Sequence, residues 1–107
     1  SSSKGARIDI MDFETTVEGT TVTVKASGKL DSVGAQEFSQ ATDGLAKDMK
    51  SIVLDFADVS YVSSAGLRSV LKLKMGSKGV DLRIINAGGM TAEIFRTAGF
   101  GSLLKDA

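Results

Sequence analysis

The first part of the chain alternates between apolar and polar residues, a pattern typical of β-strands with one exposed face. Residues 8 to 17 have mixed β character and are followed by a Glu-Gly pair that marks a turn. Residues 21 to 27 alternate strictly, with valine and alanine on one side and threonine and lysine on the other. These segments predict an antiparallel β-hairpin. Its first strand has these expected core contacts: Ile8, Ile10 and Phe13.

The apolar residues that follow repeat with the period of an α-helix. They recur at intervals of three and four residues, at Phe38, Thr42, Leu45 and Met49. Asp31 or Ser32 stands before this stretch as a candidate N-cap. We therefore predict a helix over residues 33 to 47, although Gly44 lowers its helix propensity by about 1 kcal/mol.

The second half of the chain reads as strand, helix, strand and helix. Residues 51 to 56 are apolar apart from Asp55, as expected for a strand covered on both faces. Helices are predicted over 64 to 75 and 91 to 98, with a strand over 81 to 86 between them. The first of these helices has these residues on its expected buried side: Leu67, Val70 and Leu71.

The end of the last helix has its own signal. Gly99 stands where a left-handed residue is wanted, and Phe100 follows, ready to pack back on Phe95 in a Schellman-type stop. The whole order is β-β-α-β-α-β-α. The strand–helix–strand units imply parallel pairing with right-handed crossovers, and the hairpin adds an antiparallel pair. The predicted fold is therefore a single-domain α/β structure with a mixed sheet packed by helices.

Composition narrows the function classes. The 107 residues suffice for one domain, and 13 basic residues balance 13 acidic ones, so no charge excess suggests nucleic acid or an anionic membrane. The chain has no Cys and no His, which removes thiol chemistry, disulfides, zinc–thiolate sites and imidazole catalysis. Apolar runs are too short to span a bilayer. We expect a cytoplasmic protein whose domain occupies residues 8–107, behind a disordered tail or cloning remnant over residues 1–7.

The most informative polar feature is the serine pair Ser63 and Ser64. A strand pattern leads through a short polar loop to these serines, and a helix opens directly after them. Backbone N–H groups and the helix dipole favour negative charge at a helix N-terminus. A serine there either caps the helix, worth about 1 kcal/mol, or carries a phosphate that acts as a switch. The residue pattern alone favours the cap.

Other sequence patterns that could indicate a catalytic or metal-binding site are weaker. Ser69 and Lys72 have the Ser-x-x-Lys spacing of penicillin-binding proteins, but they fall within a helix and the companion motifs are missing. A hydrolytic serine needs an adjacent base, and no His exists. Asp55 and Asp58 could hold Mg²⁺, yet two carboxylates make a weak cation site and loop solvation or capping is the better reading. No glycine-rich phosphate motif is present, so we expect no cofactor.

Three segments carry a family resemblance. They are the corner Gly28-Lys29-Leu30-Asp31, the run from Ile52 that ends in Ser63-Ser64-Ala65-Gly66-Leu67, and the closing Ile94-Phe95-Arg96-Thr97-Ala98-Gly99-Phe100. They span residues 8–104 in the right order and at the right spacing, and the middle segment is quite specific. In these segments the sequence resembles the STAS domain, a family named for sulfate transporters and anti-sigma-factor antagonists.

The resemblance implies a role for the serine pair. In bacterial anti-sigma-factor antagonists of this family, a partner kinase phosphorylates the serine just before the small residue and Gly-Leu. That position is Ser64 here, with Ser63 as the runner-up, because many members have Asp at the position of Ser63 and Ser at that of Ala65. The implied partner surface consists of Asp31, Asp58, Ser63, Ser64, Ala65, Gly66 and Leu67.

The resemblance implies two partners and no enzymatic activity of the chain itself. One partner is an anti-sigma factor that is also an ATP-using serine kinase, and the other is a serine phosphatase that resets the switch. The expected function is thus an anti-sigma-factor antagonist that binds its anti-sigma factor until Ser64 is phosphorylated. The alternative is a STAS scaffold or regulatory domain from an anion transporter or a multidomain sensor.

Overall fold

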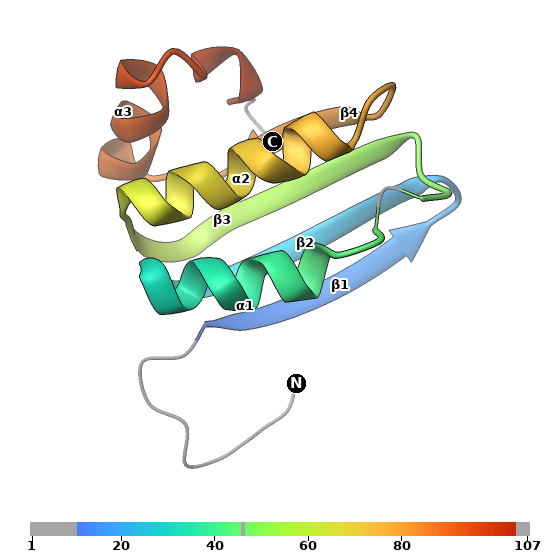
Figure 1. Cartoon of the computed structure of the whole chain (residues 1–107), viewed down its shortest axis with the longest axis horizontal. Helices are drawn as coiled ribbons and strands as arrows, with labels where there is room; N and C mark the ends of the chain where they lie inside the picture. The colour runs from blue at the N-terminus through green and yellow to red at the C-terminus, as the bar shows by residue number, and fades with distance from the viewer. Residues whose placement is uncertain (1–10, 46, 105–107) are drawn as a thin grey trace.

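The computed structural model describes residues 11–45 and 47–104. Four strands form one sheet in the order β1-β2-β3-β4 (Figure 1). The elements are β1 (Asp12–Glu18), β2 (Thr21–Leu30), α1 (Ser32–Thr42), β3 (Ser51–Val62), α2 (Ser64–Gly76), β4 (Asp81–Ile85), α3 (Gly89–Thr97) and a short 3₁₀ turn, η1 (Gly101–Leu103). The predicted tail over 1–7, and the core contacts of Ile8 and Ile10, lie outside the described residues.

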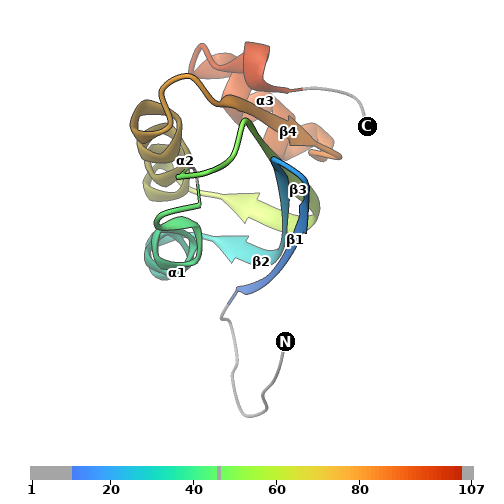
Figure 2. The ribbon, with the colours of Figure 1, turned by 90° about the vertical axis from the view of Figure 1, so that its right-hand side faces the viewer.

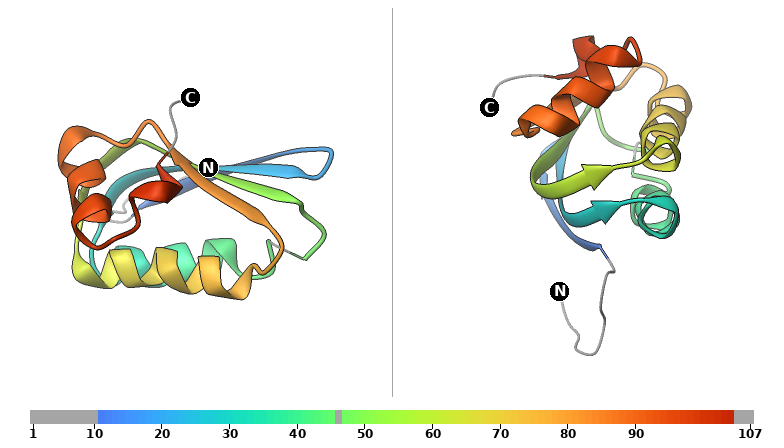
Figure 3. Two further views of the ribbon diagram at one scale, coloured as in Figure 1. Left: turned by 90° about the horizontal axis from the view of Figure 1, so that it is seen from above. Right: turned by 90° about the vertical axis from the view of Figure 1, so that its left-hand side faces the viewer.

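The mixed sheet of the prediction is confirmed. β1 and β2 pair antiparallel in an unbroken register, while β2, β3 and β4 run parallel. Gly19 has φ +61°, as the first central residue of a two-residue hairpin requires. Figure 2 shows α1 and α2 side by side on one face of the sheet. α3 lies at the end of the molecule where α2 begins (Figure 3).

The core lies between the sheet and these two helices. Buried side chains match across the parallel strands, since Val24 pairs with Leu54 and Leu54 with Ile84. Contrary to the prediction, the opposite face of β3 is not covered, since Val53 and Asp55 on that face are half-exposed. The prediction of burial on both faces was therefore wrong. The parallel strands carry α1 and α2 on the same side instead of on opposite sides.

Two element boundaries differ from the predictions by five residues or more. Helix α1 ends at Thr42 and not at 47, because Gly44 adopts φ +78° and the chain turns there. β3 continues to Val62, six residues beyond its predicted end at 56. Its second half has two register irregularities against β2, which disturb the alternation that would have identified it as a strand.

The C-terminal stop is confirmed in its backbone geometry. Gly99 has φ +90°, and the N–H of Phe100 donates to the Phe95 carbonyl oxygen at 2.8 Å. The N–H of Gly99 donates to the carbonyl oxygen of Arg96 at 3.0 Å, which completes the Schellman pair. Phe100 is half-buried against the core, while the Phe95 ring pairs with Phe56 at a centroid distance of 6.3 Å.

Candidate functional site

The candidate site lies at the edge of the sheet where the parallel strands end. β2 ends at Leu30 and β3 ends at Val62, and these two residues are paired in the sheet. Asp31 follows β2 and caps α1, while Ser63 follows β3 and caps α2. The topology therefore sets Asp31 and Ser63 beside each other. The positive ends of two helix dipoles face the same side of the molecule.

Ser63 is the capping serine. Its Oγ accepts a hydrogen bond from the N–H of Gly66 at 3.2 Å and donates to the carbonyl oxygen of Leu30 at 3.3 Å. Its backbone N–H donates to the same carbonyl oxygen at 2.9 Å. The hydroxyl is half-buried and has both a donor and an acceptor partner. Ser63 is therefore engaged in holding the start of α2 against the end of β2.

Ser64 is in the opposite situation. It is the first residue of α2, it is exposed, and its hydroxyl makes no hydrogen bond with any other described residue. The two readings of the serine pair, cap and modifiable hydroxyl, thus fall on different residues. The hydroxyl of Ser64 is open to solvent, and it stands where the backbone N–H groups of the first helical turn favour an anion.

Gly66 positions the helix and is not part of the surface. It is buried, and a Cβ built on it would lie 2.2 Å from the carbonyl oxygen of Leu30. Gly34 has the same role in α1, where a Cβ would lie 2.3 Å from the carbonyl oxygen of Lys29. Both helices therefore start in close contact with the end of β2. Of the sequence-predicted partner surface, Gly66 is the member that a partner cannot touch directly.

An apolar groove adjoins Ser64 on the side of α3. Its cavity of about 570 Å³ has these lining residues: Leu67, Gly89, Met90, Glu93, Ile94, Thr97 and Ala98. Leu67 follows Ser64 by one helical turn, so both occupy one face of α2. Met90 is 66% exposed although its side chain is apolar. Met90 was not among the predicted site residues, because the helix was predicted to start at Thr91 and no local sequence signal links α3 to α2.

Two further residues of the predicted partner surface, Ala65 and Asp58, lie in different places. Ala65 is half-buried beside Ser64. Asp58 lies further back along β3, paired with Ser27, and its carboxylate is 3.8 Å from the ammonium of Lys25. The structure thus brings Asp31, Ser63, Ser64, Ala65 and Leu67 to one edge and leaves Asp58 on the strand behind them.

The magnesium reading has no support in the geometry. The Oδ1 atom of Asp55 accepts hydrogen bonds from the N–H of Ala57 at 3.0 Å and from Nδ2 of Asn86 at 3.1 Å. The ion pair with Lys25 occupies Asp58. Among residues 11–45 and 47–104, no group of three or more His, Cys, Asp or Glu side chains could hold a metal ion.

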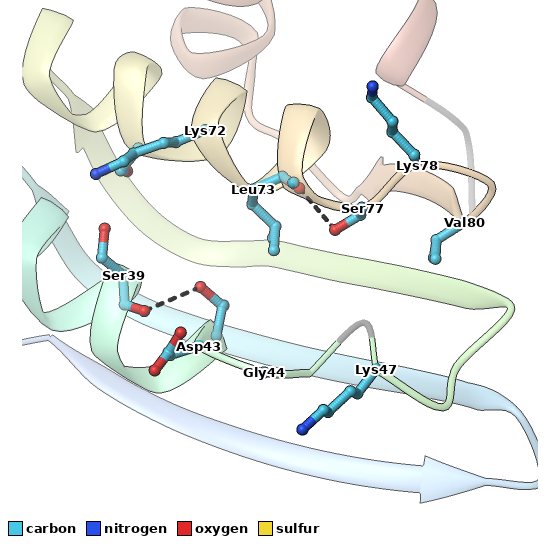
Figure 4. A pocket seen from close by; sticks show the side chains of 12 residues that line it. Ser39, Asp43, Gly44, Lys47, Lys72, Leu73, Ser77, Lys78 and Val80 are labelled. Carbon is cyan, nitrogen blue, oxygen red and sulfur yellow. Dashed lines mark hydrogen bonds between the residues drawn. The ribbon is translucent and has the colours of Figure 1, made fainter.

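A second cavity of about 630 Å³ lies between the C-terminal halves of α1 and α2 (Figure 4). Its buried hydroxyls are bonded to their own helices, as Ser69 donates to the Gly66 carbonyl oxygen and Ser77 to that of Leu73, both at 2.6 Å. The side chains of Lys72 and Lys78 point in different directions in Figure 4. The buried and bonded Ser69 hydroxyl gives no support for a nucleophile that Lys72 activates.

Comparison with known proteins places this geometry in a family. A family model described as "Mlab, STAS domain" matches residues 13–105. The chain therefore belongs to the STAS domain family. No curated protein sequence matches the chain. No helix within the described part of the chain is long and apolar enough to cross a membrane.

Solved structures of anti-sigma-factor antagonists share the fold at low sequence identity. The unphosphorylated form of SpoIIAA superposes with a TM-score of 0.74 at 20% identity, over 90% of this chain and 88% of that chain. The phosphorylated form of the Bacillus protein SpoIIAA gives the same score and identity, over 90% and 91%. An anti-sigma factor antagonist from Mycobacterium paratuberculosis reaches 0.79 at 19% identity, over 90% and 84%. The fold is that of a STAS domain, and these antagonists share it.

Proposed function

We propose that the protein is an anti-sigma-factor antagonist, a binding module that phosphorylation of Ser64 switches off. One observation carries the proposal. Ser64 presents an exposed hydroxyl that makes no hydrogen bond with another described residue, while its neighbour Ser63 caps α2. A modification of Ser64 therefore leaves the hydrogen bonds that hold the site in place intact.

The electrostatics favour a switch that keeps the fold constant. A phosphate adds about −1.5 to −2 charges at neutral pH. At the first residue of a helix this charge meets the positive end of the dipole, an interaction worth about 0.3–1 kcal/mol at an exposed site. The phosphorylated domain should remain folded, so that only its affinity for a partner changes.

The surroundings of Ser64 explain why a partner would sense the phosphate. Leu67 and the exposed Met90 border the groove beside it, so a partner that covers Ser64 also covers apolar surface. A doubly charged phosphate at the margin of such a contact would be desolvated without a compensating cation, and this desolvation lowers the affinity for the partner. A loss of about 1.4 kcal/mol already lowers affinity tenfold.

The partners follow from the same proposal. The anti-sigma factor would be an ATP-using serine kinase that docks on the neutral form, and a serine phosphatase would restore that form. SpoIIAA, an anti-sigma factor antagonist solved in both a phosphorylated and an unphosphorylated form, supports the proposal that this fold can carry the phosphate. The protein itself would be cytoplasmic, would need no cofactor and would catalyse no reaction.

The test is phosphosite mapping with the cognate anti-sigma kinase and ATP. We expect phosphate on the wild type and on Ser63→Ala, and none on Ser64→Ala. Ser32→Ala is the matched control, because Ser32 is also exposed and also the first residue of a helix, directly behind the cap Asp31. Phosphate on Ser63 alone would move the switch by one residue. Absence of phosphate from every serine, with unchanged binding, would favour the scaffold alternative.

A further inference from the structure

The two edges of the sheet are protected differently. The outer edge of β4 is partly covered, because Ile84 forms a parallel bridge with Leu104 beyond η1. β1 is the other edge strand, and among the described residues it pairs only with β2. An edge strand presents backbone N–H and C=O groups to which another strand can bind.

β1 has the backbone of a strand that can accept a partner. It runs for seven residues in an unbroken register with β2 and contains no proline, lysine or bulge. The two-residue hairpin makes Glu18 and Thr21 a hydrogen-bonded pair, and such pairs alternate along an antiparallel ladder. The backbone groups of Phe13, Thr15 and Val17 therefore point to the free edge.

The side chains of β1 give this edge a single sign of charge. Asp12, Glu14 and Glu18 alternate along the strand, so they share one face of the sheet, and all three are exposed. None of them forms an ion pair with a described residue. Lys25 stands opposite Glu14 in the register, yet its ammonium lies beside Asp58 at 3.8 Å. Within residues 11–45 and 47–104, the carboxylates of β1 thus have no ion-pair partner.

This charge pattern excludes a second copy of the chain as the occupant. Two antiparallel β1 strands centred on Thr15 would set Asp12 opposite Glu18. The neighbouring registers that keep the side-chain faces matched are centred on Glu14 or on Thr16. They would set Glu14 opposite itself or opposite Glu18. Like charges directly opposite each other destabilise a strand pair. The charges of β1 therefore disfavour pairing between the β1 strands of two copies of the chain.

We propose that the β1 edge binds an extended basic segment of a partner protein, which adds a fifth strand to the sheet. Backbone hydrogen bonds to Phe13, Thr15 and Val17 supply the contact, and Lys or Arg at every second position of the segment pairs with the carboxylates. The intervening positions of the segment are apolar, because they face the side of β1 where Val17 is 55% exposed.

The β1 edge is separate from the Ser64 site. β2 lies between β1 and β3, and α2 follows β3 on the side toward β4 (Figure 1). A segment bound at β1 leaves Ser64 and the groove beside it accessible. Binding at β1 should therefore be the same for the phosphorylated and unphosphorylated protein, and it does not depend on the proposed function.

The test uses a synthetic peptide in which Lys and Val alternate over the length of β1. Amide hydrogen exchange followed by NMR should slow at Phe13, Thr15 and Val17 when the peptide is added, and the affinity should fall with added salt. A peptide with Pro in place of every Val has the same charge but lacks the N–H groups at the positions that face Phe13, Thr15 and Val17, and its rings obstruct strand pairing, so it should give no protection. Equal protection by both peptides, or protection confined to other elements, would overturn the proposal.

Variants of the protein separate charge from backbone pairing. The double variant Glu14→Gln/Glu18→Gln should bind the Lys-Val peptide about twofold to fivefold more weakly for each carboxylate removed. Thr15→Pro should abolish the protection, because proline at an outward-facing position blocks the edge. Glu93→Gln on α3 is the control and should bind as the wild type does. Unchanged binding by the double variant, or a wild type that dimerises through β1 without peptide, would contradict the proposal.

Discussion

The hydroxyl oxygen of Ser63 lies 3.3 Å from the backbone carbonyl oxygen of Leu30, so the start of α2 is bonded to the end of the neighbouring strand. The same oxygen accepts the N–H of Gly66 at 3.2 Å, which joins strand, cap and first helical turn in one set of contacts. Ser64, one residue later, takes no part in it. The hydrogen bonds that hold the start of α2 in place therefore come from Ser63, and the exposed hydroxyl of Ser64 is separate from them.

The two serines should therefore differ in their effect on stability. Ser63→Ala removes the cap and the bond to Leu30, and we expect a loss of about 1–2 kcal/mol in the free energy of unfolding. Ser64→Ala should change it by less than about 0.5 kcal/mol, as is usual at an exposed position. Urea denaturation of both variants measures the difference. An equal loss in the two would mean that both hydroxyls contribute to the cap.

The close approach of Gly66 to β2 predicts a second stability effect. In Gly66→Ala the new methyl group would lie 2.2 Å from the carbonyl oxygen of Leu30, so the helix must move away. We expect a destabilisation of about 1–3 kcal/mol by overpacking. Gly76→Ala in the same helix is the control, since a Cβ there meets nothing within 4 Å, and it should be neutral or stabilising. A neutral Gly66→Ala would show that α2 can shift without cost.

The backbone at Gly99 predicts a substitution pattern that depends on side-chain shape. With φ at +90°, Gly99→Val should destabilise by more than about 1 kcal/mol, because a β-branched residue resists this conformation. Gly99→Asn should cost less, since asparagine tolerates positive φ. Thermal denaturation of the two variants gives the order. Equal melting temperatures for the Val and Asn variants would contradict the backbone explanation.

The centre of the core gives a prediction that tests the sheet itself. Leu54 is fully buried on β3 and paired with Val24 on one side and Ile84 on the other. Leu54→Ala should cost about 2–5 kcal/mol. Val53→Ala is the matched control, because Val53 lies on the open face of β3 and is half-exposed. This variant should lose clearly less stability. Denaturation midpoints that order the two the other way would mean that the faces are assigned wrongly.

The sequence predicted the arrangement of strands and helices well, because it follows from local periodicity. The alternation in residues 21 to 27 and the helical spacing of Phe38 and Thr42 both correspond to buried faces in the structure. The predicted cap Asp31 accepts a hydrogen bond from the N–H of Gly34 at 2.9 Å. Such features depend on neighbours in sequence, and they can be read without knowing the tertiary contacts.

The incorrect predictions concern features that depend on tertiary contacts. The polar residues Asp58 and Ser60 predict a loop in the second half of β3, yet they are exposed strand residues, and Val59 between them is buried in the core. Leu45 was assigned to the helix by its spacing, but it is half-buried in the turn after α1. At the site, the contribution of Met90 depends on how α3 packs beside α2. No pattern within either helix records that arrangement.

The last prediction tests the proposed switch at Ser64. Ser64→Asp places a negative charge at the start of α2, where the helix dipole tolerates it, so the variant should unfold at the same or a slightly higher urea concentration than the wild type. Its affinity for the anti-sigma factor should nevertheless fall at least tenfold, while Ser64→Ala should bind as the unmodified protein does.

Ser32→Asp is the control for this last experiment, because it adds the same charge at the equivalent position of α1. It should remain folded and lose less affinity than Ser64→Asp, since Ser32 is not adjacent to the groove formed by Leu67 and Met90. Isothermal titration of the three variants against the anti-sigma factor measures the order. If Ser32→Asp and Ser64→Asp lost affinity equally, net charge alone would explain the effect, and the groove beside Ser64 would not be the contact surface.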